Sequence, residues 1–137
     1  MWILYAMGSA IFAALTSITA KVGITGVDSN LGTAIRTLVV LIIATGIVLF
    51  SGAFRELPSI STKSWAFLII SGVMTGLSWL CFYKAIQIGD VSKVASIDKF
   101  SIVLVIVFSA LFLKEVVNLK VVLACLLITV GTILMIF

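Results

Sequence analysis

Three ionisable residues, Arg36, Asp98 and Lys99, lie inside long apolar stretches of the sequence. A charge placed in a membrane-spanning segment is expensive, so such residues pair with one another or mark a pathway. Counted from the same end of their helices, Arg36 lies about a turn and a half deep and Asp98 about one turn deep. Opposite charges at matching depth can pair and lower the desolvation cost. The pattern predicts either a structural Arg36–Asp98 lock or a substrate and proton site.

Lys99 follows Asp98 directly, so the two side chains leave a helix roughly 100° apart and cannot both face one partner squarely. Lys99 either reaches the headgroups of the lipid or lines a wet cavity together with Asp98. Ser96 shares the stripe of Lys99. This helix is therefore unusually polar near one end.

Neighbouring apolar stretches add polar and aromatic groups near the same end, and these predict a shared cavity. Trp79 and Tyr83 would wall it and stack on an organic cation or ring, whereas Lys99 would favour an anion. The alternative is that the hydroxyl groups bond their own helix backbone. The candidate substrate- and proton-binding residues are Asp98, Arg36, Lys99, Trp79, Tyr83, Ser96 and Thr16.

The composition requires lipid around these residues. Of 137 residues, 63% are hydrophobic and 10% charged, and the mean hydropathy is +1.38; soluble domains are about half apolar and a quarter charged. A span needs about 20 apolar residues. The sequence predicts an all-α membrane protein with five transmembrane helices, over 2–20, 31–50, 65–83, 94–113 and 119–137.

The connections are short and polar, and residues 1–137 are expected to form one domain. The segment Ser61-Thr62-Lys63-Ser64 is a plausible cap for the third helix. Small residues recur at four-residue spacing, as in Gly72 and Gly76. Such stripes serve packing within the chain or a dimer seam.

The positive charges are nearly balanced between the two membrane faces. One face receives Arg55, Lys63, Lys114 and Lys120, and the other receives Lys21, Lys84 and Lys93, with Arg36 and Lys99 slightly inside it. Because orientation follows the difference between such counts, the sequence favours dual topology, with two inverted copies pairing as a homodimer. The alternative is a single fixed orientation.

The order of several motifs resembles the EamA family of the drug/metabolite transporter superfamily. The pattern runs from Trp79-x-x-Phe82-Tyr83-x-Ala85 through Gly89-Asp90-Val91-Ser92-Lys93-Val94 to Leu111-Phe112-Leu113-Lys114-Glu115, and a last apolar helix contains Gly131. The resemblance covers nearly the whole chain as one repeat. Family members usually carry two such repeats in ten helices, the second inverted, which implies that a lone repeat acts as an antiparallel dimer.

Two residues depart from the family pattern. Many members have a proline near the position of Asp98, and a glycine where this chain has Lys114. The charged pair at Asp98 and Lys99 therefore indicates a site chemistry different from that of other members.

We predict a small secondary transporter in the cytoplasmic membrane that moves a small metabolite or organic ion by alternating access, with Asp98 as coupling carboxylate. Proton coupling requires that Arg36 move away from Asp98 or never pair with it. The alternative is a non-transporting subunit that packs against a partner membrane protein. An enzyme is not expected, because the chain has no His and no recognised nucleophile motif. No cofactor, metal or nucleic acid is indicated.

Overall fold

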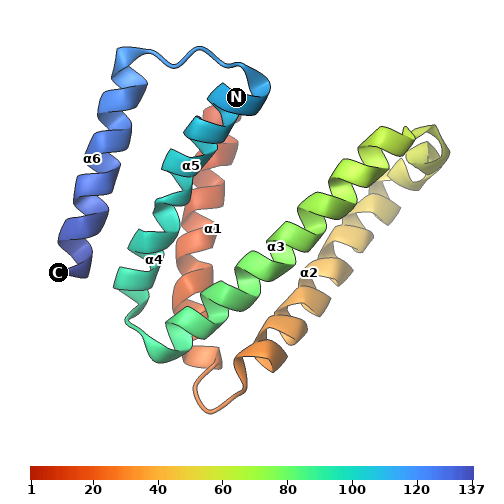
Figure 1. Cartoon of the computed structure of the whole chain (residues 1–137). Helices are drawn as coiled ribbons and strands as arrows, with labels where there is room; N and C mark the ends of the chain where they lie inside the picture. Colours follow the sequence, from red (N-terminus) through yellow and green to blue (C-terminus); the bar gives the residue numbers. More distant parts are fainter. The chain divides into compact units, whose positions relative to one another are not determined.

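The computed structural model describes all residues from 1 to 137, and every element in it is helical (Figure 1). Five helical spans are long and apolar enough to cross a membrane, which confirms the predicted fold class. They are α1 (Trp2–Gly23), α2 (Ser29–Ser51), α3 (Thr62–Ile88), the composite span Val91–Leu113 and α6 (Leu119–Ile136).

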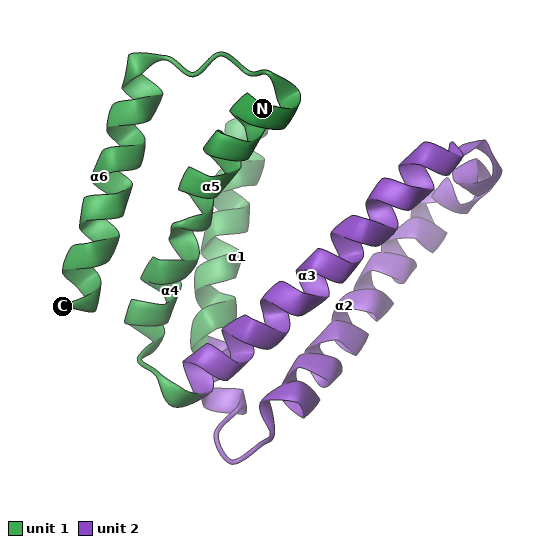
Figure 2. Ribbon diagram, in the orientation of Figure 1, with its two compact units in different colours: residues 1–18, 88–137 green, residues 19–87 purple.

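The chain divides into two compact units (Figure 2). Unit 1 comprises Met1–Ile18 and Ile88–Phe137, and unit 2 comprises Thr19–Gln87. The expectation of one domain over residues 1–137 stays a prediction. Helix α1 contributes to both units, because the boundary falls within it.

In unit 2, polar caps and a glycine set the ends of the helices. The carboxylate of Asp28 accepts hydrogen bonds from the backbone N–H groups of Asn30 and Leu31, at 2.9 and 3.2 Å, and so begins α2. Gly52, in the left-handed conformation at φ 72°, ends it. A 3₁₀ helix, η1 (Ala53–Ser59), follows. The predicted cap of α3 is confirmed, since the backbone N–H of Ser64 donates to Ser61 Oγ at 3.1 Å.

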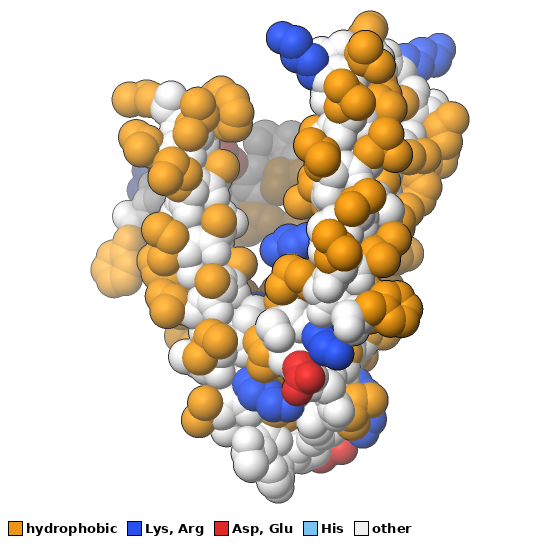
Figure 3. All heavy atoms as spheres, turned by 90° about the vertical axis from the view of Figure 1, so that its left-hand side faces the viewer, with side chains coloured by type: hydrophobic (Ala, Val, Ile, Leu, Met, Phe, Trp, Pro, Cys, Tyr) orange, Lys and Arg blue, Asp and Glu red, His pale blue; other side chains and the backbone are white.

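The buried part of unit 2 lies where α1, α2 and α3 meet near the α1–α2 loop. Ile24, Tyr83 and Ile86 are buried there, together with the small polar residues Ser29 and Thr33. By contrast, most large apolar side chains along the helices are exposed. Figure 3 shows hydrophobic side chains covering the visible helices over most of their length, as expected of surfaces that face lipid.

In unit 1, the fourth span is not one continuous helix. It comprises α4 (Val91–Lys99), α5 (Ser101–Phe108) and a π turn, η2 (Ser109–Leu113). The break lies at Phe100, where the bonds from Phe100 N to Ile97 O and from Val103 N to Phe100 O, 2.9 and 3.0 Å, join residues three apart. Such local tightening to 3₁₀ spacing interrupts the span without a proline.

The predicted end of the helix over 94–113 is confirmed, and one correction is needed at its start. The helix begins three residues earlier, because Asp90 has extended backbone angles and takes the N-cap position. It also ends in a turn that Lys114 closes with φ 55°, the only positive φ outside glycine. A lysine thus adopts the left-handed conformation at the position where the family resemblance places glycine.

Candidate functional site

In unit 2, the guanidinium group of Arg36 on α2 lies over two aromatic rings of α3. The Arg36 Cζ atom is 3.9 Å from the centroid of the Trp79 ring and 5.5 Å from that of Tyr83. Residues four apart on a helix share one face, so Trp79 and Tyr83 present their rings to the same neighbour. Both distances fall within the range of cation–π attraction. The three predicted site residues of this unit are thus in contact.

The buried base of unit 2 holds this cluster in place. Tyr83 is only 5% exposed. Gly32 lies one turn before Arg36, and a Cβ atom there would meet Tyr83 and Ile24 at 3.6 Å, an ordinary contact distance. The Tyr83 ring and the Ile24 side chain therefore lie against α2 at Gly32, one turn from the contact of Arg36 with the rings.

Two side-chain hydrogen bonds tie the C-terminal end of α3 to the α1–α2 region. Lys21 Nζ donates to the Ile86 carbonyl at 2.6 Å, and Gln87 Nε2 donates to the Val27 carbonyl at 2.7 Å. The last carbonyls of a helix lack partners in the helix and carry partial negative charge, so a lysine there stabilises them. Sequence reasoning placed Lys21 among the loop charges and missed this role, although a cation near a helix end was the available signal.

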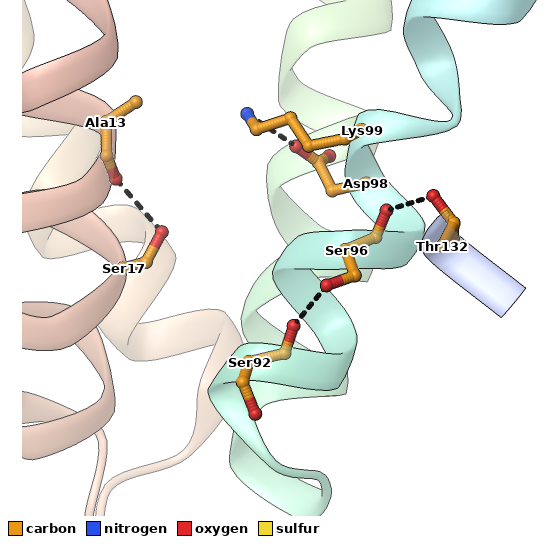
Figure 4. A network of polar contacts seen from close by, with 7 residues as sticks. All are labelled: Ala13, Ser17, Ser92, Ser96, Asp98, Lys99 and Thr132. Carbon is orange, nitrogen blue, oxygen red and sulfur yellow. Dashed lines mark hydrogen bonds and ion pairs between the residues drawn. The ribbon is translucent and has the colours of Figure 1, made fainter. Parts of the chain in front are cut away.

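In unit 1, Asp98 and Lys99 contact each other. Lys99 Nζ lies 3.6 Å from Asp98 Oδ2, and the two side chains are 60% and 43% exposed, respectively (Figure 4). The pair occupies the last residues of α4, directly before the break at Phe100. The predicted Arg36–Asp98 pair joins residues of different units and stays a prediction.

Ser96 is a buried packing residue between α4 and α6. Its hydroxyl lies 2.7 Å from the Ser92 carbonyl and 3.0 Å from the sulfur of Met135, and its carbonyl accepts from Thr132 Oγ1 at 3.4 Å. Only 8% of the residue is exposed. A role for Ser96 in binding substrate stays a prediction, as does one for Thr16, which is half-buried on α1.

Five other hydroxyl groups in the spans bond the backbone of their own helix. They donate to the carbonyl four residues earlier, at 2.7–3.0 Å. These residues are Ser17, Thr33, Thr37, Thr75 and Thr129. This is the alternative left open by the sequence, and it leaves the charged and aromatic groups as the distinctive chemistry of the spans.

Lys93 repeats at α6 what Lys21 does at α3. Its Nζ donates to the Ile136 carbonyl at 3.0 Å, so it stabilises the C-terminal end of that helix.

A groove of about 560 Å³ lies between α2 and η1, with Phe54 and Glu56 in its lining, and the sequence did not predict it. No cluster of three or more metal-ligating residues occurs.

The fold and these groups define the class: a multi-pass α-helical membrane protein that carries ionisable residues within its spans. The model of the EamA-like transporter family matches residues 1–137. The chain belongs to this family.

Two relatives carry the word transporter in their names. An uncharacterized transporter in the cobO 3' region of Sinorhizobium sp is 44% identical over 118 residues, covering 86% of this chain and 84% of its own length. Uncharacterized transporter YvbV of Bacillus subtilis (strain 168) is 33% identical over 124 residues, covering 86% of this chain but only 39% of the relative. No solved structure matches. The chain is therefore a membrane transporter.

Proposed function

We propose that the protein is a small secondary transporter of the cytoplasmic membrane. It moves a small metabolite or organic ion by alternating access, with Asp98 as the carboxylate that exchanges a proton for substrate. The observation that carries this proposal is the broken fourth span. Transporters often place substrate and ion sites at discontinuous helices. In this span Phe100 interrupts the regular helix by a local tightening of its hydrogen bonds, with helical backbone angles. Asp98 and Lys99 lie directly before this interruption.

The partly exposed pair suits a coupling role. An aspartate that accepts and releases protons must not be enclosed by the protein, and the Asp98 side chain is 43% exposed. Its partner Lys99 is the adjacent residue at 3.6 Å rather than a group on a distant helix. Protonation of Asp98 therefore breaks an ion pair within α4 and leaves the contacts between α4 and α6 in place.

We further propose that two copies pair in opposite orientations. The near-balance of Lys and Arg between the faces supports this pairing. So does the match to YvbV, which covers 39% of that chain and leaves room in it for a second segment of the same size. On α3, a Cβ atom added at Gly72 or Gly76 would meet nothing within 4 Å, so this face is open to a second helix.

Flux through liposomes tests the transport proposal. Purified protein alone should acidify or alkalinise the lumen when a proton gradient and a mixture of candidate metabolites are imposed, and Asp98→Asn should abolish the coupled flux. The open face of α3 would equally suit a subunit that packs against another membrane protein. That alternative predicts no flux from the purified chain and co-purification with a partner.

Reporter fusions test the pairing. A reporter at either terminus, read from both sides of the membrane, should give comparable signals for a dual-topology protein. A signal confined to one side would contradict the antiparallel homodimer and leave the transport proposal standing.

A further inference from the structure

The rings of Trp79 and Tyr83 are already occupied by a cation of the chain itself. An aromatic face that binds an organic cation has to be free, yet the Arg36 guanidinium lies 3.9 Å from the Trp79 centroid. A ligand cation would have to displace this group and would meet like charge beside it. The ring faces that Arg36 contacts are therefore not available to a ligand cation.

Stacking leaves the donors of Arg36 available. Within unit 2, the Arg36 side chain contacts these two rings and forms no ion pair. A guanidinium group stacked by its planar face keeps its N–H donors at the edge, in the fork geometry that matches carboxylate and phosphate oxygens. Arg36 is half-buried, so part of the residue stays accessible.

The residues around Arg36 hold its side chain in position but do not neutralise its positive charge. Tyr83 is buried. Thr33 lies about one turn before Arg36 and Thr37 directly follows it. Both hydroxyl groups donate to backbone carbonyls of α2, at 2.8 and 2.7 Å. Asp28, the acidic residue closest in sequence, caps the start of α2. A cation held in a span by rings, without a carboxylate of its own unit, is poised to receive an anion.

We infer that Arg36, stacked on Trp79 and Tyr83, binds the carboxylate or phosphate group of a small organic anion, which is the substrate class of this transporter. This inference rests on the proposed function and deepens it. The two rings act as positioning residues, because they hold the guanidinium plane while its edge contacts the ligand.

Fluorescence of Trp79 gives a direct test that needs no transport. In a Trp2→Phe, Trp65→Phe background Trp79 is the only tryptophan, since the chain has three. Both replaced residues are exposed, at 77% and 43%. The protein, in a phosphate-free sugar detergent, is titrated with three probes that share one ring: benzoate, phenyl phosphate and phenyltrimethylammonium.

Benzoate, phenyl phosphate or both should change the emission of Trp79 saturably, and phenyltrimethylammonium should not. Arg36→Gln should weaken anion binding at least about tenfold, because a charge-assisted bidentate contact is lost. The same substitution should create binding of phenyltrimethylammonium, because it frees the ring faces. Arg36→Lys keeps the charge but not the fork, so anion binding should fall by a smaller factor. Arg55→Gln, at the only other arginine, should leave all titrations unchanged.

Several results would overturn the inference. They are equal anion binding in Arg36→Gln, binding of phenyltrimethylammonium to the unsubstituted site, and no response to either anion. A response to added phosphatidylglycerol micelles alone would assign the site to a lipid headgroup and would likewise overturn it. If Arg36→Gln does not fold, two measurements still test the inference. They are the preference of the unsubstituted protein for anions over the cation and the titration of Arg36→Lys.

The binding experiment and the flux experiment can fail independently of each other. Anion binding through Arg36 without flux in liposomes would contradict transport alone. Proton-coupled flux with no preference for anions at Trp79 would contradict the substrate class alone.

Discussion

The two units hold their ionisable residues in different ways. In unit 2, Arg36 is stacked on two rings, one of them buried, above a base in which Ile86 is fully buried. In unit 1, Asp98 and Lys99 form an ion pair with each other and are partly exposed, directly before the interruption at Phe100. The fixed cation suits recognition and the exposed carboxylate suits proton exchange. Under the proposed function, this difference would assign substrate binding to unit 2 and proton coupling to unit 1.

The largest expected effect is on flux. Asp98→Asn should reduce coupled transport in liposomes to the level of protein-free vesicles, because the exchangeable carboxylate is lost. Lys99→Gln changes the other member of the pair and should leave measurable flux that still depends on the pH gradient. Equal loss of flux in both variants would mean that Asp98 and Lys99 act together in holding the structure. The assignment of proton exchange to Asp98 alone would then be wrong.

The next largest effect is on the stability of unit 2. Tyr83→Ala empties a buried aromatic position and should lower the free energy of unfolding by about 2–4 kcal/mol. Tyr5→Ala, at a residue that is 81% exposed, serves as the matched control and should change it little. Thermal unfolding in detergent measures both. Similar values for the two variants would show that the base of unit 2 does not hold the Arg36 cluster.

A smaller effect separates the two helix-capping lysines. Lys21→Met removes a partly buried charged hydrogen bond to the end of α3 and should destabilise by about 1.5 kcal/mol. Lys93→Met removes an exposed equivalent at α6 and should cost about 0.5 kcal/mol. The same unfolding assay compares them. The reverse order would contradict the expectation that the helix-end contact in unit 2 contributes more to stability than the one in unit 1.

The smallest effect concerns the end of the fourth span. Lys114→Gly should raise the free energy of unfolding by about 0.5 kcal/mol, because glycine adopts a positive φ without a steric penalty. Lys114→Ala loses the charge but keeps the Cβ atom, so it should bring no such gain. If alanine and glycine stabilise equally, the charge of Lys114, rather than its backbone, is the cause.

The sequence was sufficient for the spans and for the charged residues within them. Apolar length alone placed all five spans, and the Ser61 cap followed from its side-chain chemistry. The contact of Arg36 with Trp79 was not predicted, because it depends on how α2 and α3 are rotated about their axes. The break at Phe100 was not predicted either, because no proline is present there. It consists of a change in backbone hydrogen bonding that the pattern of side chains does not indicate.

The break at Phe100 also affects how mutations in this span are to be read. A continuous helix advances by about 100° per residue, so tolerance to substitution repeats with a fixed period. Where the backbone tightens at Phe100, and again where it widens in the π turn Ser109–Leu113, that rotation is reset. A cysteine-accessibility scan from Val91 to Leu113 should therefore show separate periodic patterns that are out of phase with one another. Counting at 100° per residue across Phe100 therefore misplaces the later residues by a small part of a turn.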